Sequence, residues 1–170
     1  MATSNAATNY LERRLLHYIF KNNSLSFSSP GDSIYVSSAN FGSGNANGLG
    51  SNIYVGLATA VSNFDDSTGE SADAGSVSVT EANFGGYQRV QTTAWTLVSP
   101  TANQQTAKNT NAIDFAAKTD SGTQTVTHVF INDASSSGNF LFIGALDASK
   151  TLAEGDIFRI NATNLSIELK

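Results

Sequence analysis

The chain divides into a short segment with helical periodicity and a long remainder with strand-like periodicity. Leu11, Leu15 and Ile19 recur at helical spacing after Asn9, a residue type favoured at helix N-caps. The pattern predicts an amphipathic helix over residues 10–21, about three turns long. Because a helix this short is marginal alone in water, its apolar stripe needs a protein surface to pack on.

Beyond residue 22, apolar and polar residues alternate in short runs, which predicts β-strands. Gly, Asn, Asp and Ser bound these runs, and short turns between successive strands favour antiparallel hairpins. The predicted strands are 33–37, 52–57, 88–97, 113–116, 123–132, 139–145, 156–160 and 165–168. Polar loops are predicted at 41–50, 62–76, 101–111 and 147–155.

Eight short strands predict a mainly β fold, namely an antiparallel β-sandwich, of which a jelly roll is one form, with one short N-terminal α-helix. A length of 170 residues is enough for one domain with its own core. We expect an N-terminal arm and amphipathic helix over 1–22 and a single β-sandwich domain over 23–170.

Composition narrows the classes of function. Charged residues make up 14% of the chain, against about a quarter in typical globular domains. A neutral polar surface of this kind is typical of proteins that become buried in an assembly, and of robust extracellular β-proteins. The absence of cysteine excludes disulfides, a thiolate nucleophile and a Cys-zinc site. No apolar run matches a bilayer and no secretory signal is recognised, so we expect cytoplasmic synthesis and no membrane partner.

The charge is unevenly distributed along the chain. Residues 1–21 carry three basic residues and one acidic residue, a net charge of +2, whereas the remainder carries six basic and 13 acidic residues, a net charge of −7. The acidic body would repel phosphates, which argues against nucleic acid as the main partner. The basic N-terminal segment could dock on an acidic protein surface, and a solvated helix face is the alternative.

Candidate catalytic groups are few. Gly31, Asp32 and Ser33 form a motif seen in one class of serine esterases, but that chemistry needs a histidine base near the C-terminus. The last histidine is His128, within a predicted strand, where a hydrogen-bonded structural role is the more common one. We therefore interpret Gly31–Ser33 as a turn and predict no catalytic residue.

Metal and cofactor sites also lack support. Asp65, Asp66 and Glu70 offer oxygen ligands within the 62–76 loop, but their spacing is not that of an EF-hand. A solvated loop is the default interpretation, and binding of an ion or a glycan by this loop is left open. The sequence thus predicts no cofactor, no metal site and no enzyme activity.

Several separated segments carry a resemblance to a known family. They are residues 10–16, 53–59, 85–90, 111–116, 126–133, 138–146, 150–152, 154–156 and 165–169. Together they resemble a family of small tailed-bacteriophage virion proteins, often described as tail fibre or head decoration proteins. Compared with shorter members of that family, this chain has longer insertions at about 22–51 and 60–80.

The resemblance implies a non-enzymatic virion protein with a self-associating β-sandwich body on the capsid exterior or the tail. Our leading interpretation is a capsid decoration or cement protein that binds the major capsid protein and forms a homo-dimer or homo-trimer. The expected contacts with the capsid or a sister subunit are Tyr10, Leu11, Arg13, Arg14, Leu15, Ile19 and Lys21.

Three other functions stay open at this point. The first is a tail fibre or receptor-binding module that recognises the host surface. The others are a hydrolase acting on surface polysaccharide and a lectin-like domain of non-viral origin. The number of copies per virion separates decoration from a tail part.

Overall fold

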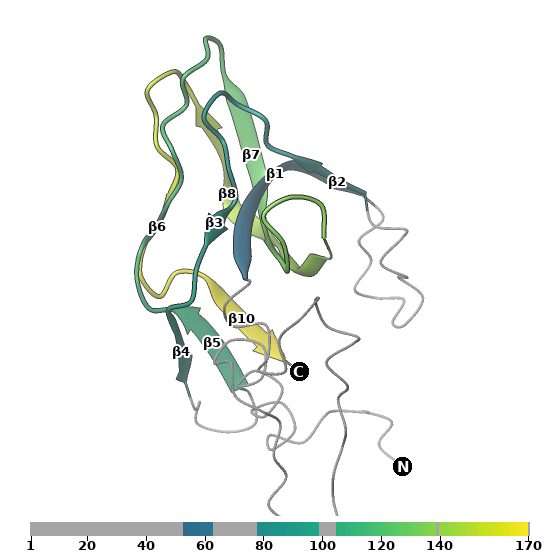
Figure 1. Cartoon of the computed structure of the whole chain (residues 1–170), viewed down its shortest axis with the longest axis vertical. Coiled ribbons are helices and arrows are strands. Elements are labelled where there is room, and N and C mark those ends of the chain that lie inside the picture. Colours follow the sequence, from purple (N-terminus) through teal and green to yellow (C-terminus); the bar gives the residue numbers. More distant parts are fainter. Residues whose placement is uncertain (1–52, 63–77, 99–104, 139, 170) are drawn as a thin grey trace, which may run out of the picture. The chain divides into compact units, whose positions relative to one another are not determined.

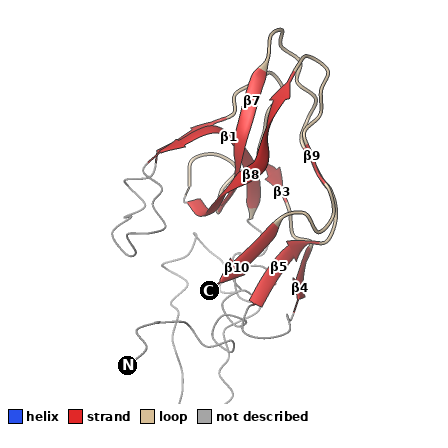
Figure 2. Ribbon diagram, turned by 180° about the vertical axis from the view of Figure 1, so that it is seen from behind, coloured by secondary structure: helices blue, strands red, loops and turns tan. Residues whose placement is uncertain are grey.

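The computed structural model describes residues 53–62, 78–98, 105–138 and 140–169. Within those ranges the chain forms ten strands and no helix (Figure 2). The ladders of the two larger sheets are antiparallel, so the prediction of a mainly β, antiparallel fold is confirmed. Four predicted elements lie outside the described residues: the helix 10–21, the strand 33–37, the loop 41–50 and, apart from residue 62, the loop 62–76.

The described residues belong to two compact units, each built from separated segments of the chain. The five-stranded unit consists of Tyr54–Gln91 and Ile113–Arg159. Among the described residues, the three-stranded unit contains Ile53 and the described parts of Thr92–Ala112 and Ile160–Lys170. The sandwich arrangement and the domain division at residue 22 stay predictions.

The five-stranded unit is organised around two central strands. Its sheet has the order β2 (Ser78–Glu81), β1 (Tyr54–Ser62), β7 (Gln124–Asn132) and β8 (Phe140–Leu152), and β3 (Val90–Gln91) also pairs with β1 (Figure 1). β3 pairs with the first residues of β1 and β2 with the last ones. Two short strands therefore share one edge of β1, and a gap separates them at Leu57.

Both faces of the sheet are apolar near its centre. Val55 and Leu57 pair with Ile131 and Val129, so these four side chains lie on one face, and all are buried. On the other face, buried Phe130 pairs with Gly56. A strand buried on both faces has a near-continuous apolar sequence, which describes the centres of β1 and β7.

Loops of the same unit carry a chain of aromatic rings. Phe84 meets Tyr87 edge to face with ring centroids 5.3 Å apart, Tyr87 stacks on Phe115 at 6.1 Å, and Phe115 meets Phe158 edge to face at 5.9 Å. Offset and edge-to-face pairs at these distances are favourable beyond the area that they bury. The rings thus join loop 82–89 to the segments around β6 (Ile113–Asp114) and β9 (Arg159–Ile160), which form a two-stranded sheet.

The three-stranded unit has the order β10 (Ser166–Leu169), β5 (Gln105–Asn109) and β4 (Trp95–Val98). Trp95, Ala107 and Ile167 are buried in it. Asn109, at the end of β5, is fully buried and is held by three side-chain hydrogen bonds.

The strand predictions succeeded where large apolar residues are concentrated. The predicted strand 123–132 agrees with β7, and 165–168 agrees with β10. The predicted strand 52–57 is continued in β1 to Ser62, and 113–116 is shortened in β6 to two residues.

Other predictions about strands and loops were wrong. The single strand predicted over 88–97 is two strands in different sheets, β3 and β4. The loop predicted over 101–111 contains β5, whose residues are mostly small or polar, and β8 continues into the turn predicted at 147–155. The strand predicted over 156–160 is reduced to the two residues of β9, and β2 was not predicted.

Candidate functional site

Two groups of residues named in the sequence analysis lie outside the described residues. The first is the set of expected partner contacts, namely Tyr10, Leu11, Arg13, Arg14, Leu15, Ile19 and Lys21, and the second is Asp65, Asp66 and Glu70. His128 is described: its Nδ1 lies 2.8 Å from the Thr127 hydroxyl, and the side chain is half-buried. The structural role predicted for His128 agrees with this hydrogen bond. Among the described residues, His128 thus lies near no other residue that the sequence singled out as a candidate catalytic or metal-binding group.

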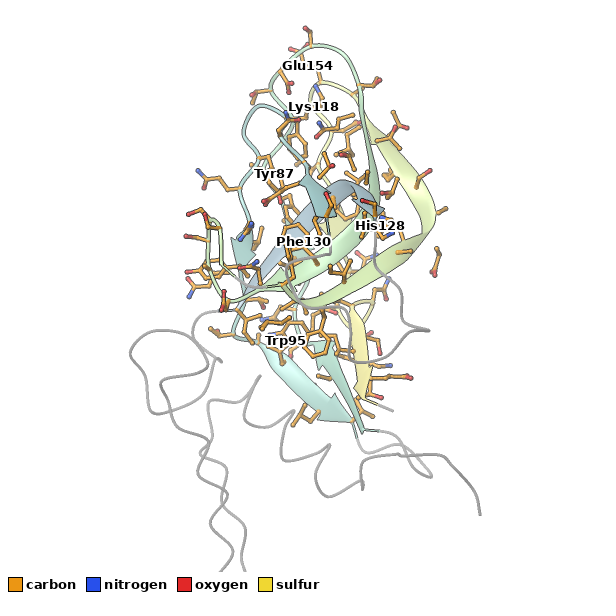
Figure 3. All side chains as sticks on the ribbon, turned by 90° about the vertical axis from the view of Figure 1, so that its right-hand side faces the viewer. Tyr87, Trp95, Lys118, His128, Phe130 and Glu154 are labelled. Atoms are coloured by element: carbon orange, nitrogen blue, oxygen red, sulfur yellow. The ribbon has the colours of Figure 1, made fainter. Side chains whose placement is uncertain are left out.

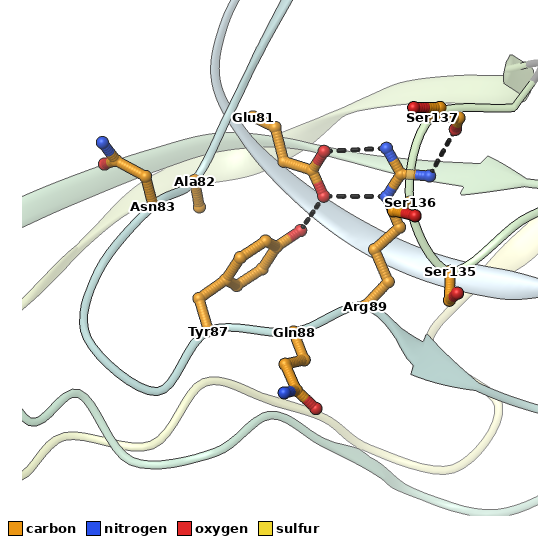
Figure 4. Close-up of a pocket in the computed structure, with 9 residues that line it drawn as sticks. All are labelled: Glu81, Ala82, Asn83, Tyr87, Gln88, Arg89, Ser135, Ser136 and Ser137. Atoms are coloured by element: carbon orange, nitrogen blue, oxygen red, sulfur yellow. Dashed lines mark hydrogen bonds and ion pairs between the residues drawn. The ribbon is translucent and has the colours of Figure 1, made fainter.

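A shallow depression in the five-stranded unit is the candidate site. It has a volume of about 640 Å³ and lies between the end of β2, loop 82–89 and the β7–β8 hairpin loop (Figure 4). Its lining residues are mostly polar, namely Glu81, Ala82, Asn83, Tyr87, Gln88, Arg89, Ser135, Ser136 and Ser137.

A bidentate ion pair forms part of the lining of the depression. Arg89 donates from Nε to Glu81 Oε1 and from Nη2 to Oε2, both at 2.8 Å (Figure 4). The Arg89 side chain is only 5% exposed and that of Glu81 is 30% exposed. Two parallel charge-assisted hydrogen bonds fix both the distance and the orientation of the pair.

The same arginine ties the hairpin loop to the sheet. Its Nη1 donates to the carbonyl oxygens of Ala134 at 2.9 Å and Ser137 at 2.7 Å. The guanidinium carbon also lies 5.1 Å from the centre of the Phe130 ring, within the range of a cation–π contact. Arg89 thus has little hydrogen-bonding capacity left for a ligand.

Tyr87 connects the ion pair to the gap in the edge of β1. Its hydroxyl donates to Glu81 Oε1 at 2.7 Å and accepts from the Leu57 N–H at 3.0 Å. Leu57 lies in β1 between the residues that pair with β3 and those that pair with β2, so neither short strand is its partner. The tyrosine hydroxyl therefore satisfies a backbone donor that would lack a strand partner.

These contacts shift the pKa values of the group. Burial alone would raise the pKa of Glu81, but the hydrogen bonds from Arg89 and Tyr87 outweigh it, so the pKa lies below its usual value. Burial, together with the hydrogen bond to Glu81, raises the pKa of Tyr87 well above its usual value. At neutral pH Glu81 is thus an ionised carboxylate and Tyr87 a protonated phenol. Neither group has a pKa suited to proton transfer at that pH.

The rim of the depression keeps unused hydrogen-bonding capacity. Gln88, Ser135 and Ser136 are exposed, and their side chains make no hydrogen bond within the part of the chain that the structure describes. Asn83 uses its Oδ1 and its backbone N–H on Gln124. The surface offered to a ligand consists of neutral amides and hydroxyls around a neutralised ion pair.

A second buried charge lies at the loop-rich end of this unit, where Figure 3 shows Lys118 near Glu154. The Lys118 ammonium group donates to Asp120 Oδ1 at 3.0 Å and to the carbonyl oxygens of Asp120 and Ser121. Its side chain is 1% exposed. Because the ammonium group is enclosed by its own loop, Lys118 holds the loop in shape and does not face a substrate.

Metal and membrane features can be assessed only for the described residues. Among them no three or more His, Asp or Glu side chains gather closely enough to hold a metal ion. The same residues include no helix long and apolar enough to span a bilayer.

The sequence pattern does not predict this site. Residues 85–90 were part of the family resemblance, but no motif marked Glu81 and Arg89 as partners. They lie eight residues apart and do not belong to one strand, so the two-residue period of a strand does not predict that their side chains meet. The pairing depends on the return of loop 82–89 to β1, and only the fold reveals it.

The geometry defines an antiparallel β protein whose most elaborate site consists of mutually bonded polar groups around a shallow surface depression. The family model described as podophage GP4 fiber I protein gp80 matches residues 49–168, 120 of the 170 residues. The chain belongs to this family, and the expected relation to a phage virion protein family is confirmed. No curated protein matches the chain.

Proposed function

We propose that the chain is a non-enzymatic structural protein of the phage fibre apparatus, which contacts the host surface through the depression at Glu81–Arg89. Support comes from the family match over 49–168 and from the chemistry of the depression. We therefore favour the tail-fibre function, which was the alternative in the sequence analysis, over capsid decoration. Location in the virion follows from the same family description.

The observation that carries the proposal is that the charges of the depression are already neutralised. Arg89 is held by Glu81 and by two carbonyl oxygens, which leaves no free cation among the lining residues for a phosphate, sulfate or carboxylate. The remaining groups are amides and hydroxyls, which lie beside a half-buried Glu81 carboxylate. Such groups suit the hydroxyls of a neutral sugar, which both donate and accept hydrogen bonds.

The same neutralisation supports a function without catalysis. A nucleophile needs an adjacent base, and a general base needs a carboxylate or imidazole with a free lone pair and a suitable pKa. Glu81 has a lowered pKa and both of its oxygens are engaged, while Tyr87 is held protonated. The lining residues thus provide contacts for a ligand but no reactive pair.

The test is a binding measurement on the full-length protein with purified host surface polysaccharide, in neutral and in acidic forms. We expect preferential binding of the neutral form and at least about tenfold weaker binding by a Gln88→Ala, Ser136→Ala double variant, since each lost hydrogen bond is worth about 1 kcal/mol. The matched control is Asn164→Ala with Ser166→Ala, exposed residues in the three-stranded unit. Equal affinities of the two double variants, or a preference for the acidic form, would contradict the proposal.

Capsid decoration is the second candidate, and the uneven charge of the chain favours it. Residues 1–21 carry a net charge of +2 and the remainder −7, so the N-terminal segment could bind an acidic patch of the major capsid protein. Tyr10, Leu11, Arg13, Arg14, Leu15, Ile19 and Lys21 would supply that contact. In both candidates the protein self-associates, and its sheets pack as a sandwich.

A three-dimensional reconstruction of the virion separates the two candidates. Hundreds of copies on the capsid exterior would establish decoration, whereas a few to tens of copies at the tail would establish a fibre part. Deletion of residues 1–22 adds a second readout, because it should abolish particle binding only in the decoration case.

A further inference from the structure

Loop 82–89 turns back sharply between two legs that both line the depression. Residues 81–83 form the first leg and residues 87–89 the second (Figure 4). In the turn 84–87 between them, the N–H of the last residue donates to the carbonyl oxygen of the first at 2.9 Å, and φ of Gly86 is +89°. A positive φ at the third residue is characteristic of type II turns. The shape of this turn therefore sets the spacing between the two legs.

A neighbouring loop, which follows β6, holds this turn by its backbone. The Thr119 N–H donates to the Gly85 carbonyl oxygen at 2.9 Å, and the Gly85 N–H donates to Asp120 Oδ1 at 2.7 Å. The approach is close, because a Cβ atom at Gly85 would lie 2.5 Å from Thr119 Oγ1, and one at Gly86 would lie 2.9 Å from the Ala117 carbonyl oxygen. Both polar backbone groups of Gly85 are thus used, and no larger residue fits the contact without a shift.

The carboxylate in this contact is oriented by a buried cation. The Lys118 ammonium group donates to Asp120 Oδ1 at 3.0 Å and to the Asp120 carbonyl oxygen, so the same Oδ1 accepts from both Lys118 and Gly85. The Lys118 side chain is 1% exposed, whereas that of Asp120 is 52% exposed. A buried ammonium group is costly unless it is paired and hydrogen-bonded, which favours a fixed position for Asp120.

Lys118 is itself fixed by a third segment of the chain. Its N–H donates to the Asp156 carbonyl oxygen at 2.9 Å, and its carbonyl oxygen accepts from the Gly155 N–H at 2.8 Å. The backbone and the side chain of Lys118 are therefore both engaged. Contacts thus run without a break from Lys118 through Asp120 to the turn 84–87, and from there to the two legs of the depression.

We propose that Asp120, oriented by Lys118, is a positioning residue of the depression, because it fixes the turn 84–87 and the spacing of the two legs before a ligand arrives. Neither residue lines the depression. The inference rests on the proposed function, in which the depression binds a neutral sugar, and it adds two residues that act on the depression from outside. A loop that is already ordered loses less conformational freedom on binding, which raises the affinity.

The test compares two substitutions of Asp120 in the full-length protein. Asp120→Ala removes the acceptor of the Gly85 N–H, whereas Asp120→Asn removes the charge but keeps an oxygen that can accept the same hydrogen bond. Asp147→Ala, at an exposed aspartate of β8, is the control for the loss of one negative charge. Thermal unfolding establishes the temperature range in which every variant is folded, and all measurements are made within that range.

Two readouts need no ligand. Asp120→Ala should accelerate amide exchange of Gly85 at least about tenfold, because hydrogen bonds to charged groups are among the stronger ones. It should also shift the NMR signals of Asn83 and Gln88, which line opposite legs of the depression. Asp120→Asn should keep the exchange within about threefold of the unmodified protein and leave these signals in place, since the acceptor is retained. Asp147→Ala should change neither readout.

The third readout is the affinity for neutral host polysaccharide. We expect Asp120→Ala to weaken binding at least about fivefold, and Asp120→Asn and Asp147→Ala to leave it within about twofold of the unmodified value. A loss of stability alone would not change the affinity of molecules that are folded. Recovery of affinity in Asp120→Asn therefore distinguishes a positioning role from a merely stabilising one.

A second variant loosens the same contact from the other side. Gly85→Ala adds a methyl group that would overlap with Thr119 Oγ1, so the turn must move away from the neighbouring loop while Lys118 and Asp120 keep their ion pair. We expect it to shift the signals of the two legs and to weaken binding as Asp120→Ala does. This variant decides the question even if Asp120→Ala does not fold.

The proposal is overturned if Asp120→Ala accelerates exchange at Gly85 but leaves the signals of Asn83 and Gln88 and the affinity unchanged, because the contact would then act only locally. It is also overturned if Asp120→Asn behaves like Asp120→Ala. An unmodified protein that binds no polysaccharide would contradict the proposed function alone. The two readouts without ligand would then still decide whether Asp120 positions the legs of the depression.

Discussion

At the scale of single residues, Arg89 is the most heavily used side chain of the five-stranded unit. Four of its N–H donors are accounted for, two by Glu81 and two by the carbonyl oxygens of Ala134 and Ser137. The flat guanidinium matches these acceptors in a way that the point charge of lysine cannot. Arg89 therefore joins β2, loop 82–89 and the β7–β8 hairpin, and its contribution to stability should be large for a polar residue.

Replacing Arg89 by leucine should lower the free energy of unfolding by about 3 kcal/mol, the low end of the range for breaking a buried pair, because Glu81 is partly hydrated. The loss includes two carbonyl oxygens without donors and a carboxylate without its partner. Urea denaturation followed by circular dichroism measures it.

Arg159 provides a matched control, because its ion pair is exposed to solvent. It makes a comparable ion pair with Asp114, but the two side chains are 59% and 46% exposed. Ion pairs that are this exposed contribute little to stability because water screens them, so Arg159→Leu should leave the free energy of unfolding nearly unchanged. Similar losses in the two variants would show that the burial of Arg89 does not determine its contribution.

At the scale of elements, the close packing of β1 against β7 depends on one glycine. The Phe130 ring lies over Gly56, its partner in the register, so closely that a side chain at Gly56 would overlap with the ring. A glycine within a strand often marks such a close approach, and the ring covers the backbone that the glycine leaves open. Gly144, the partner of Val129 on β8, faces open space instead.

Gly56→Ala and Gly144→Ala thus add the same methyl group to one sheet with opposite consequences. Gly56→Ala should destabilise the fold by about 1–3 kcal/mol, the usual cost of overpacking. Gly144→Ala should be neutral or should stabilise the strand by about 0.5 kcal/mol, because glycine is a poor strand residue. Thermal unfolding of both variants measures the difference, and equal melting temperatures would contradict the contact with Phe130.

How far the sequence predicts these elements depends on side-chain size. β7 was predicted almost to the residue because Val126 and the continuous run from Val129 to Ile131 are large and apolar. β5 was missed because its buried residues are Thr106, Ala107 and Asn109, which a hydrophobic pattern does not select. Burial of small and polar residues follows from tertiary packing, and the local pattern does not contain it.

The candidate site was less predictable than the strands. The sequence indicated that no nucleophile with a suitable base exists, and that conclusion still supports the proposal of a binding protein. The depression itself depends on an arginine that is almost fully buried, although arginine is usually an exposed residue. A single sequence carries no signal for that exception.

At the scale of the whole molecule, the chain passes between its two compact units four times, after Ile53, Gln91, Ala112 and Arg159. Neither unit is a continuous segment, so neither can be separated from the other by a single cut. Contacts within one unit close loops that belong to the other, and this connectivity favours unfolding as one cooperative system. The expected single domain over 23–170 requires the same behaviour.

Asn109 provides the test of this cooperativity, because its three side-chain hydrogen bonds all lie in the three-stranded unit. Its Nδ2 donates to the carbonyl oxygens of Asn111 and Asn161, and its Oδ1 accepts from the Leu165 N–H at 2.9 Å. Asn109→Ala leaves these groups without partners in a buried position and should lower the free energy of unfolding by about 2–3 kcal/mol, whereas exposed Asn164→Ala should not change it measurably.

Amide exchange then distinguishes cooperative from independent units. If the units unfold together, Asn109→Ala accelerates the exchange of the most protected amides of β7, in the five-stranded unit, by the same free energy that denaturation measures. If they unfold separately, the exchange of β7 stays unchanged while that of β5 and β10 increases, and denaturation shows two transitions. The second result would contradict a single folding domain, because β7 would then keep its stability without the three-stranded unit.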